Sequence, residues 1–185
     1  MHYCACPIHC SFALESGQEA RIVKIDFSAA FDRVNHLGIL YELCSVGVGG
    51  YVLSILTQFL SNLSQHFMVD RCRSKLVKVV SGVPEGSVFG PLLFLLYTSE
   101  LFLILENNLI GYADDYTLMA VVPSPGVRIA VAESLIRDLG RVSEWCCLWG
   151  MKLNESKTKT MTVSRSRTMH PQSPPNYWRN CTEGV

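Results

Sequence analysis

The sequence predicts an α+β fold in which one sheet is backed by helices. A β-branched run at residues 21–27, which contains Asp26, indicates a central strand. Two apolar runs, at residues 109–111 and 118–122, flank an Ala-Asp-Asp turn and predict a hairpin. Between residues 131 and 149, apolar side chains recur at intervals of three and four, which is typical of an amphipathic helix. Strands interleaved with helices in this way are typical of an α+β sheet.

Shorter patterns predict the other elements. Leucines at helical spacing predict a helix that ends before Gly47, and a second helix follows it. Two strands are expected around a basic turn, and a Gly/Pro loop leads into a long apolar helix with Ser87 at its N-cap. The predicted ranges are 37–44 and 51–63 for the two helices, 65–70 and 76–80 for the strands, 81–87 for the loop, 87–105 for the apolar helix and 160–163 for a last strand.

The ends of the chain carry no predicted element. Residues 1–20 show no clear period, and the polar, Pro-containing residues 165–185 are expected to be disordered, so the folded domain is expected over residues 21–164. The N-terminus lacks the features of a signal peptide. The longest apolar stretch, which begins at Pro91, is interrupted by polar residues from Thr98 to Glu100. We therefore expect an intracellular protein with no membrane partner.

The composition is sufficient for a packed core, but the charges neither favour nor exclude binding of nucleic acid. The 185 residues are 49% apolar, which is ample for a core. The formal net charge is zero, whereas proteins that bind phosphate backbones usually carry a basic excess. Basic residues nevertheless gather in two segments, which a solvated surface explains as well as a nucleic-acid contact does. These are Arg71, Arg73, Lys75 and Lys78, and Lys152, Lys157, Lys159, Arg165, Arg167 and Arg179.

Three aspartates are the candidates for chemistry. Asp26 lies at the end of the first predicted strand, and Asp114 and Asp115 lie at the tip of the predicted hairpin. An Asp pair in a turn often only bonds its own backbone. Three carboxylates about 5 Å apart would repel one another by about 3 kcal/mol per pair at an effective dielectric of about 20, and therefore require a cation. Mg²⁺ suits such oxygen ligands, and a nuclease, a cyclase or a polymerase would use such a site.

Four motifs follow one another along the chain. They are Asp26-Phe27-Ser28-Ala29-Ala30-Phe31-Asp32, Ser81-Gly82-Val83-Pro84-Glu85-Gly86-Ser87 with Gly90-Pro91, Tyr112-Ala113-Asp114-Asp115, and Trp149-Gly150-Met151-Lys152-Leu153-Asn154 with Lys157-Thr158. In order and spacing they resemble the motifs of reverse transcriptases, in the style of non-LTR (LINE-like, jockey-type) retrotransposons. The resemblance covers about residues 21–164. It implies a polymerase palm, a ferredoxin-like sheet backed by helices, with partial fingers and no thumb.

The resemblance also implies a reaction, RNA-directed DNA polymerisation with an RNA template, a DNA primer and dNTPs, which in a functional relative takes place in the nucleus. Asp26, Asp114 and Asp115 would hold two Mg²⁺ ions, with Mn²⁺ as an alternative, and Lys157 would protonate the departing pyrophosphate. Phe31 would act as a steric gate against ribonucleotides. The residues implied to bind the nucleotide are Phe27, Ala30, Phe31, Pro84, Glu85 and Gly86, and those implied to border primer or template are Gly82, Ser87, Gly90 and Tyr112.

Three departures from the family pattern lead us to expect a truncated copy with impaired activity. Glu85 stands where the family usually has Gln, and a carboxylate can only accept hydrogen bonds and adds a charge. Only 25 residues precede Asp26, so the upstream fingers that grip the triphosphate are expected to be missing, as is the thumb. Residues 176–185 lack the strand that follows in relatives. The alternative is a non-enzymatic remnant that at most binds RNA.

Overall fold

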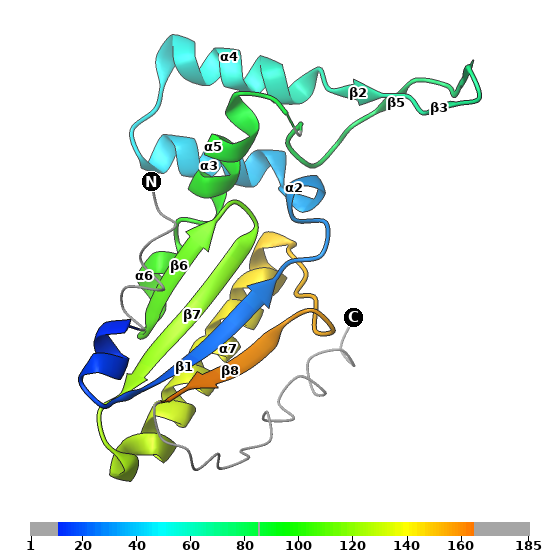
Figure 1. The fold of residues 1–185 in the computed structure, drawn as a ribbon. Helices are drawn as coiled ribbons and strands as arrows, with labels where there is room; N and C mark the ends of the chain where they lie inside the picture. Colours follow the sequence, from blue (N-terminus) through cyan, green and yellow to red (C-terminus); the bar gives the residue numbers. More distant parts are fainter. Residues whose placement is uncertain (1–10, 85, 165–185) are drawn as a thin grey trace. The chain divides into compact units, whose positions relative to one another are not determined.

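The computed structural model describes residues 11–84 and 86–164 (Figure 1). The chain divides into two compact units. The first contains Met1–Ser28, Glu100–Leu148 and Lys152–Val185, and the second contains Ala29–Ser99 and Trp149–Met151. The first unit is therefore assembled from segments that are far apart in the sequence. Glu85 and the two end segments, residues 1–10 and 165–185, lie outside the described residues.

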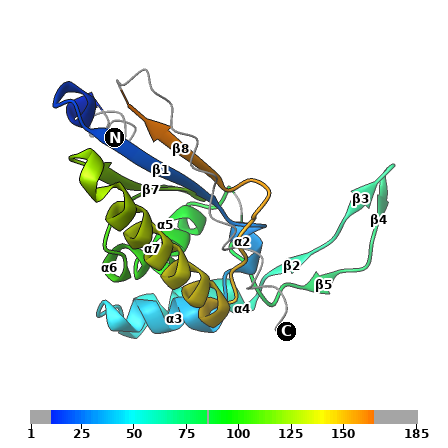
Figure 2. The same cartoon turned by 90° about the horizontal axis from the view of Figure 1, so that it is seen from below.

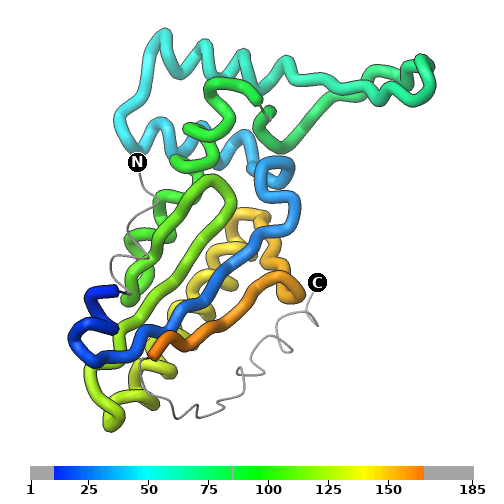
Figure 3. The backbone as a smooth tube through the Cα atoms, viewed as in Figure 1, coloured from blue at the N-terminus to red at the C-terminus, as the bar shows by residue number. Residues whose placement is uncertain are grey.

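An antiparallel sheet of four strands forms the first unit. Its strands are β1 (Glu19–Asp26), β6 (Asn108–Tyr112), β7 (Asp115–Val122) and β8 (Lys159–Val163), in the spatial order β6-β7-β1-β8. Figure 3 shows the chain leaving the sheet after β1 and returning to it as β6. Among these strands the order is second, third, first, fourth, which is the order of a ferredoxin-like βαββαβ sheet. The predicted α+β fold with a ferredoxin-like sheet is confirmed.

The core of the first unit lies between this sheet and helix α7 (Arg128–Trp149), which follows a short 3₁₀ turn, η1 (Pro125–Val127) (Figure 2). On one sheet face, alternate residues of β1 and β7 are buried, as the two-residue period of strands requires. Val23 pairs with Leu118, and Ile25 pairs with Tyr116. The predicted amphipathic helix is confirmed. Its buried residues are Leu135, Asp138, Leu139, Val142, Trp145 and Cys146.

The second unit is mostly helical, with α2 (Ala30–Arg33), α3 (His36–Ser45), α4 (Gly50–Ser61) and α5 (Phe89–Tyr97). Asn35 caps α3, because its side-chain oxygen accepts hydrogen bonds from the backbone N–H groups of Leu37 and Gly38. Gly38 allows α3 to approach Tyr97, since a Cβ at this glycine would lie 2.8 Å from the Tyr97 ring. The two helices predicted after Asp26 are therefore confirmed as α3 and α4.

The prediction of one long apolar helix over residues 87–105 is wrong. The segment forms two helices, α5 and the short α6 (Leu101–Ile104). Thr98 is the C-cap of α5, and its buried hydroxyl donates to the backbone carbonyls of Phe94 and Leu95, a type of bond that often bends helices. The chain passes from the second unit to the first just after this point. None of the helices within the described residues is both long and apolar enough to cross a membrane.

Two other boundaries differ from the prediction. Ser87 lies one residue before the N-cap of α5, which is Val88, although its hydroxyl still accepts a hydrogen bond from the Gly90 N–H at 2.9 Å. The two strands expected around the basic turn form two short ladders instead. In them β2 (Ser64–Gln65) pairs with β5 (Val77–Lys78), and β3 (Met68–Val69) pairs with β4 (Cys72–Arg73).

Candidate active site

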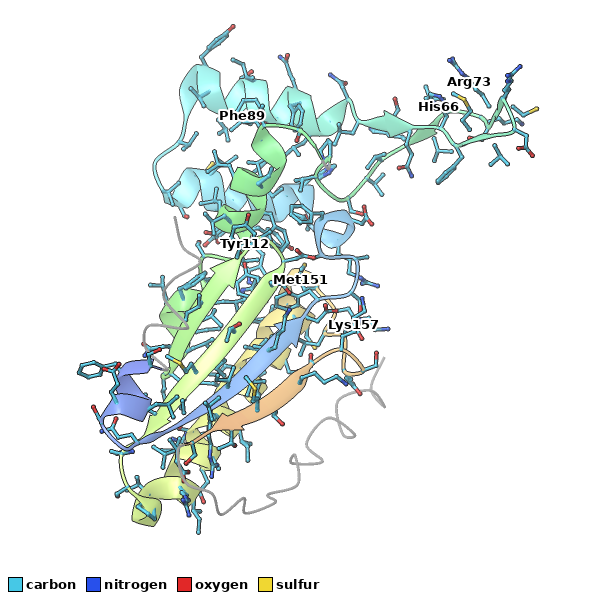
Figure 4. The ribbon with its side chains drawn as sticks, in the orientation of Figure 1. His66, Arg73, Phe89, Tyr112, Met151 and Lys157 are labelled. Atoms are coloured by element: carbon cyan, nitrogen blue, oxygen red, sulfur yellow. The ribbon has the colours of Figure 1, made fainter. Side chains whose placement is uncertain are left out.

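The predicted hairpin brings Asp114 and Asp115 to one end of the sheet. Tyr112 on β6 pairs with Asp115 on β7, so only Ala113 and Asp114 form the turn, and Asp115 is the first residue of a strand. Ala113 has a positive φ of 51°, which suits the first central position of a type II′ hairpin turn. Both aspartates are exposed, and Tyr112 is also exposed at the end of β6 (Figure 4).

Asp26 meets this hairpin through strand register. It is the last residue of β1 and is paired directly with Asp115 of β7. Residues paired in this way point to the same face of the sheet, with Cβ atoms about 5 Å apart. This face is opposite the one on which Val23 and Ile25 are buried, because side chains alternate along β1. Register therefore brings two acids that are 89 positions apart in the sequence to one end of the sheet.

Lys24 supplies a positive charge beside these acids. It lies two residues before Asp26 on the same face, and its Nζ is 3.0 Å from Asp115 Oδ1. Its hydrogen bond with Asp115 raises the pKa of the Lys24 ammonium, and the charges of Asp26 and Asp114 raise this pKa further. Both partners of the ion pair are about half exposed, so the pair itself contributes little to stability. The fields of all three carboxylates thus converge on one ammonium group.

The segment that carries Lys157 is anchored to the end of β1. The Asn154 N–H donates to the Asp26 carbonyl at 2.8 Å, and the Ser28 N–H donates to the Lys152 carbonyl at 2.8 Å. The Asp26 N–H in turn donates to the Thr158 hydroxyl at 3.4 Å. Lys157 itself is exposed, on the loop before β8 (Figure 4). Backbone hydrogen bonds therefore attach the loop of Lys157 to the residue that carries the first aspartate.

The carboxylates do not converge as a closed metal cage. Within residues 11–84 and 86–164, no three His, Cys, Asp or Glu side chains gather closely enough to hold a metal ion. Asp115 instead faces Lys24. The donors do have the chemical type that a hard divalent cation prefers; Asp114 and Asp115 are exposed, and Asp26 is half-buried at the same end of the sheet. The aspartates therefore fit a divalent cation by their ligand type and by the strand register that pairs Asp26 with Asp115. In the structure, the ammonium of Lys24 balances the negative charge of Asp115.

Phe27 has its side chain in the core. It is 4% exposed, and its ring lies 5.4 Å from that of Tyr116 and 6.2 Å from that of Trp145, measured between centroids. Its side chain thus continues the buried face of β1, away from the face of Asp26. A nucleotide contact at Phe27 would have to come from its main chain.

In the second unit, Phe31 is held against α5. Its ring stacks on Phe94 with a centroid distance of 4.6 Å and an interplanar angle of 29°. Phe31 is half-buried, while the neighbouring Ala30 is 4% exposed. Ala29, the residue before α2, has a positive φ of 49°, so the chain turns sharply there. The ring of Phe31 is therefore fixed by stacking.

The glycine-containing loop, residues 81–87, is attached to the same segment. The Val83 N–H donates to the Phe31 carbonyl at 3.0 Å, and the Gly82 N–H donates to the Val34 carbonyl at 2.8 Å. Gly82 has a φ of 90°, and a Cβ there would lie 2.9 Å from the Asp32 backbone, so only glycine fits.

The start of α5 closes onto this loop. A Cβ at Gly90 would lie 2.6 Å from the Pro84 carbonyl oxygen, to which the Ser87 hydroxyl donates. The structure thus joins Phe31, Gly82, Pro84, Ser87 and Gly90 within one unit. Gly86, also in this loop, is exposed with a φ of 78°. The place of Glu85 lies outside the described residues.

Sequence reasoning missed three residues around the aspartates. Lys24 could have been found, because a residue two positions before Asp26 in a strand lies on the same face. Asn154 and Thr158 were quoted within a motif, but their anchoring role depends on contacts with a strand more than 120 positions earlier. No local pattern signals such a contact.

Comparison with known proteins gives a consistent result. The sequence pattern of the family described as "Reverse transcriptase (RNA-dependent DNA polymerase)" matches residues 6–177. The RNA-directed DNA polymerase from mobile element jockey of Drosophila melanogaster is 30% identical over 82% of the chain, and the chain covers 17% of that protein. The probable RNA-directed DNA polymerase from transposon BS, also of D. melanogaster, is 31% identical over 81% of the chain, which again covers 17% of the relative.

Solved structures share the fold. A telomerase from Candida tropicalis, determined with the TWJ fragment of telomeric RNA, matches 84% of the chain with a TM-score of 0.59 and 12% identity, over 28% of its own length. The corresponding telomerase from Candida albicans matches 88% of the chain with a TM-score of 0.59 and 16% identity, over 30% of its own length. At these identities the likeness concerns the fold, and it supports the palm-like α+β architecture.

Proposed function

Because this chain belongs to the reverse transcriptase family and to its jockey-type, non-LTR retrotransposon branch, we propose that it carries the RNA-directed DNA polymerase site of such an element. The proposed reaction is attack of a primer 3′-hydroxyl on the α-phosphate of a dNTP, with release of pyrophosphate. The observation that carries the proposal is the register that pairs Asp26 with Asp115 beside the turn residue Asp114. The chain spans 17% of these relatives, so the reaction is proposed for the site alone.

Three carboxylates on one sheet edge suit Mg²⁺ or Mn²⁺, and reverse transcriptases as a family use divalent ions. We assign Asp26, Asp114 and Asp115 as the residues that would hold two such ions. When bound, the ions stabilise the attacking and leaving oxygens of a phosphoryl transfer. The protein's own part is to fix the carboxylates, and antiparallel pairing of β1 with β7 does this for Asp26 and Asp115.

Lys157 is the proposed proton donor to pyrophosphate. Support comes from the hydrogen bonds that tie its loop to the main chain of Asp26, through Asn154 and Thr158. A lysine on a loop anchored to Asp26 would be held close to the charge that develops on pyrophosphate. Asn154 and Thr158 are therefore proposed as positioning residues. Tyr112, exposed at the end of β6, is proposed to border the primer end.

Phe31 and the loop bonded to it are proposed to bind the nucleotide sugar and base pair. The stacked ring of Phe94 restricts Phe31 to one orientation, as a steric gate requires. In the loop bonded to Phe31, Gly82 has no side chain that would keep a nucleotide from the main chain. Ala30 keeps the adjoining position small.

Replacing Phe31 by Ala is expected to raise the use of ribonucleotides relative to deoxyribonucleotides by about 10- to 100-fold, the range for one change in pocket size. The measurement is the ratio of kcat/KM for CTP and dCTP in primer extension. Phe31→Tyr, which keeps the ring, is the matched control and should retain the wild-type ratio. Unchanged discrimination in Phe31→Ala would count against the gate.

Replacing Lys24 by Met is expected to tighten Mn²⁺ binding by about two- to fivefold, because an exposed ion pair of up to about 1 kcal/mol no longer competes for Asp115. The measurement is titration of Mn²⁺ followed by electron paramagnetic resonance, without nucleotide. Lys24→Arg keeps the charge and serves as the control. Equal affinities for wild type and Lys24→Met would show that Lys24 does not compete with the ion.

The experiment that tests the proposed function is primer extension by the purified chain on an RNA template, with Mg²⁺ and each dNTP in turn. Addition of the single dNTP complementary to the next template base is expected, and it should require both the template and the metal. Parallel reactions without template, and with EDTA, are the controls. Absence of any templated addition, together with absence of metal-dependent dNTP binding, would overturn the proposal in favour of a non-enzymatic remnant.

A further inference from the structure

A second surface on this protein has no role in the proposed chemistry. Residues 64–78, which we name the basic arm, contain the ladders β2–β5 and β3–β4 and extend from the end of α4 away from the helices of the second unit (Figure 1). All fifteen of these residues are exposed. The arm is held by its ladder bonds and by Ser74, whose N–H donates to the Phe67 carbonyl and whose hydroxyl accepts from the Phe67 N–H. The arm therefore contributes nothing to a core.

The backbone at the tip of the arm has an energetically unfavourable conformation. Asp70 and Arg71 lie between the paired residues Val69 and Cys72 and have φ values of 48° and 65°. Two consecutive positive φ angles define a type I′ turn, for which Asn-Gly is the favoured pair. A left-handed conformation costs about 1–2 kcal/mol for a residue with a Cβ, and Arg has no local bond that offsets this cost. An arginine at this position is thus not explained by the stability of the turn.

The charge of the arm is strongly positive. Arg71, Arg73, Lys75 and Lys78 lie within eight residues, and Asp70 is the only acid from 64 to 78. In the part of the chain that the structure describes, none of these four cations makes an ion pair. Figure 4 labels Arg73 on the outer part of the arm. Four unpaired cations on a protruding hairpin favour a polyanionic partner.

Apolar side chains are interleaved with these cations. Phe67 is 67% exposed, and Met68, Val69, Leu76 and Val77 are exposed beside it. Proteins that bind single strands combine cations that follow the phosphates with aromatic rings on which bases stack. In a duplex the bases are stacked on one another. A duplex could therefore bind the cations of the arm through its phosphates, but it has no free base to stack on the ring of Phe67. The combination on the arm fits a single strand best.

We propose that the basic arm binds single-stranded nucleic acid, with its four cations on the phosphates and Phe67 against a base, and RNA is the probe in the experiments below. This site uses none of Asp26, Asp114 and Asp115 and requires neither metal nor dNTP. Binding of a strand by the arm can therefore be tested independently of the polymerase reaction. The binding measurements are made in EDTA, with the exposed acids of α7 changed in Glu133→Gln/Glu144→Gln as a control that is expected to bind RNA as the wild type does.

Cys72, an exposed free thiol between Arg71 and Arg73, provides a direct footprint. Alkylation by N-ethylmaleimide, followed by peptide mass spectrometry, is expected to slow at Cys72 by at least about fivefold when a saturating 20-nucleotide uridine RNA is bound. Cys44 and Cys147, which are exposed on α3 and α7, are internal controls and should react at unchanged rates. Equal protection of all three thiols, or none at Cys72, would overturn the proposal.

Fluorescence anisotropy with the same RNA tests the two kinds of contact. Changing all four cations of the arm to Gln is expected to reduce the slope of log K against log salt by about 3, at about 0.7 for each phosphate contact on a single strand. Phe67→Ala should weaken binding by about 5- to 100-fold with an unchanged slope, as loss of one stacked base predicts. Because the arm buries no side chain, the melting temperature should not fall in either variant.

Two further variants separate charge from backbone. Arg71→Gly relieves the left-handed turn yet should weaken RNA binding, whereas Asp70→Asn keeps the turn and should strengthen it. An affinity that follows turn stability instead of charge would overturn the proposal. The same holds if a duplex of equal length binds as tightly as the single strand, or if the four-cation variant loses binding to anionic phospholipid vesicles but not to RNA.

Discussion

Replacing Asp114 and Asp115 together by Asn is expected to lower the rate of primer extension by a factor of about 10³ or more. Each amide keeps the size of the carboxylate but removes a charge, and in the proposed mechanism several kcal/mol of transition-state stabilisation would depend on cations held by these charges. The fold should remain intact, because both side chains are exposed and the ion pair that is lost, Lys24 with Asp115, is half exposed. Single-turnover extension and thermal unfolding measure the two quantities.

The matched control is Glu133→Gln/Glu144→Gln. It makes the same chemical change at two exposed acids of α7 and should leave the extension rate within about a factor of two, as for surface changes in general. If the Asp114→Asn/Asp115→Asn variant retained a tenth of the wild-type rate, these carboxylates would not be the metal ligands of the reaction.

The largest effect on stability is expected at Asp138, a fully buried acid on α7. Its carboxylate accepts hydrogen bonds from the backbone N–H groups of Glu106 and Asn107 at 2.9 and 2.8 Å, and from the Asn107 side chain at 2.8 Å. Arg141 also donates to it at 2.8 Å. Asp138 thus fixes the chain just before β6, the strand that leads to the Asp114 turn.

Replacing Asp138 by Ala is expected to lower the free energy of unfolding by about 3–5 kcal/mol, because each hydrogen-bond donor left without its buried acceptor costs about 1–3 kcal/mol. Two backbone amides and a guanidinium would lose their acceptor, while no partner would be gained. Urea unfolding should show a lower midpoint with an unchanged m-value. Asp138→Asn keeps one acceptor oxygen and should lose about half as much.

Glu133→Ala, an exposed change on the same helix, is the control and should cost less than about 0.5 kcal/mol. A loss below 1 kcal/mol in Asp138→Ala would mean that water or a neighbouring side chain replaces the carboxylate. In either case the effect reports on the first unit, since Asp138, Glu106 and Asn107 all belong to it.

Local patterns predicted the elements whose residues interact mainly with their neighbours in sequence. The hairpin and the strand that ends at Asp26 are apolar, β-branched runs, and the helix α7 has a clear period of three to four residues. The helix over 87–105 was predicted too long because the three polar residues Thr98 to Glu100 were assigned to the same helix as the apolar residues on either side, whereas Thr98 is the C-cap of α5 and its hydroxyl donates to the Phe94 carbonyl. Periodicity does not detect one bond of this kind.

The sequence by itself determined the family and the α+β class, and it singled out the three aspartates as candidates, because these inferences depend on residue types in a fixed order. Tertiary structure alone decided which face each side chain occupies. Register placed Asp26 opposite Asp115 with Lys24 beside them, and it put Phe27 in the core. Packing of α7 buries Asp138, which accepts hydrogen bonds from two backbone N–H groups that lie 31 and 32 positions earlier in the sequence. Such contacts follow from packing between distant segments, which no local pattern records.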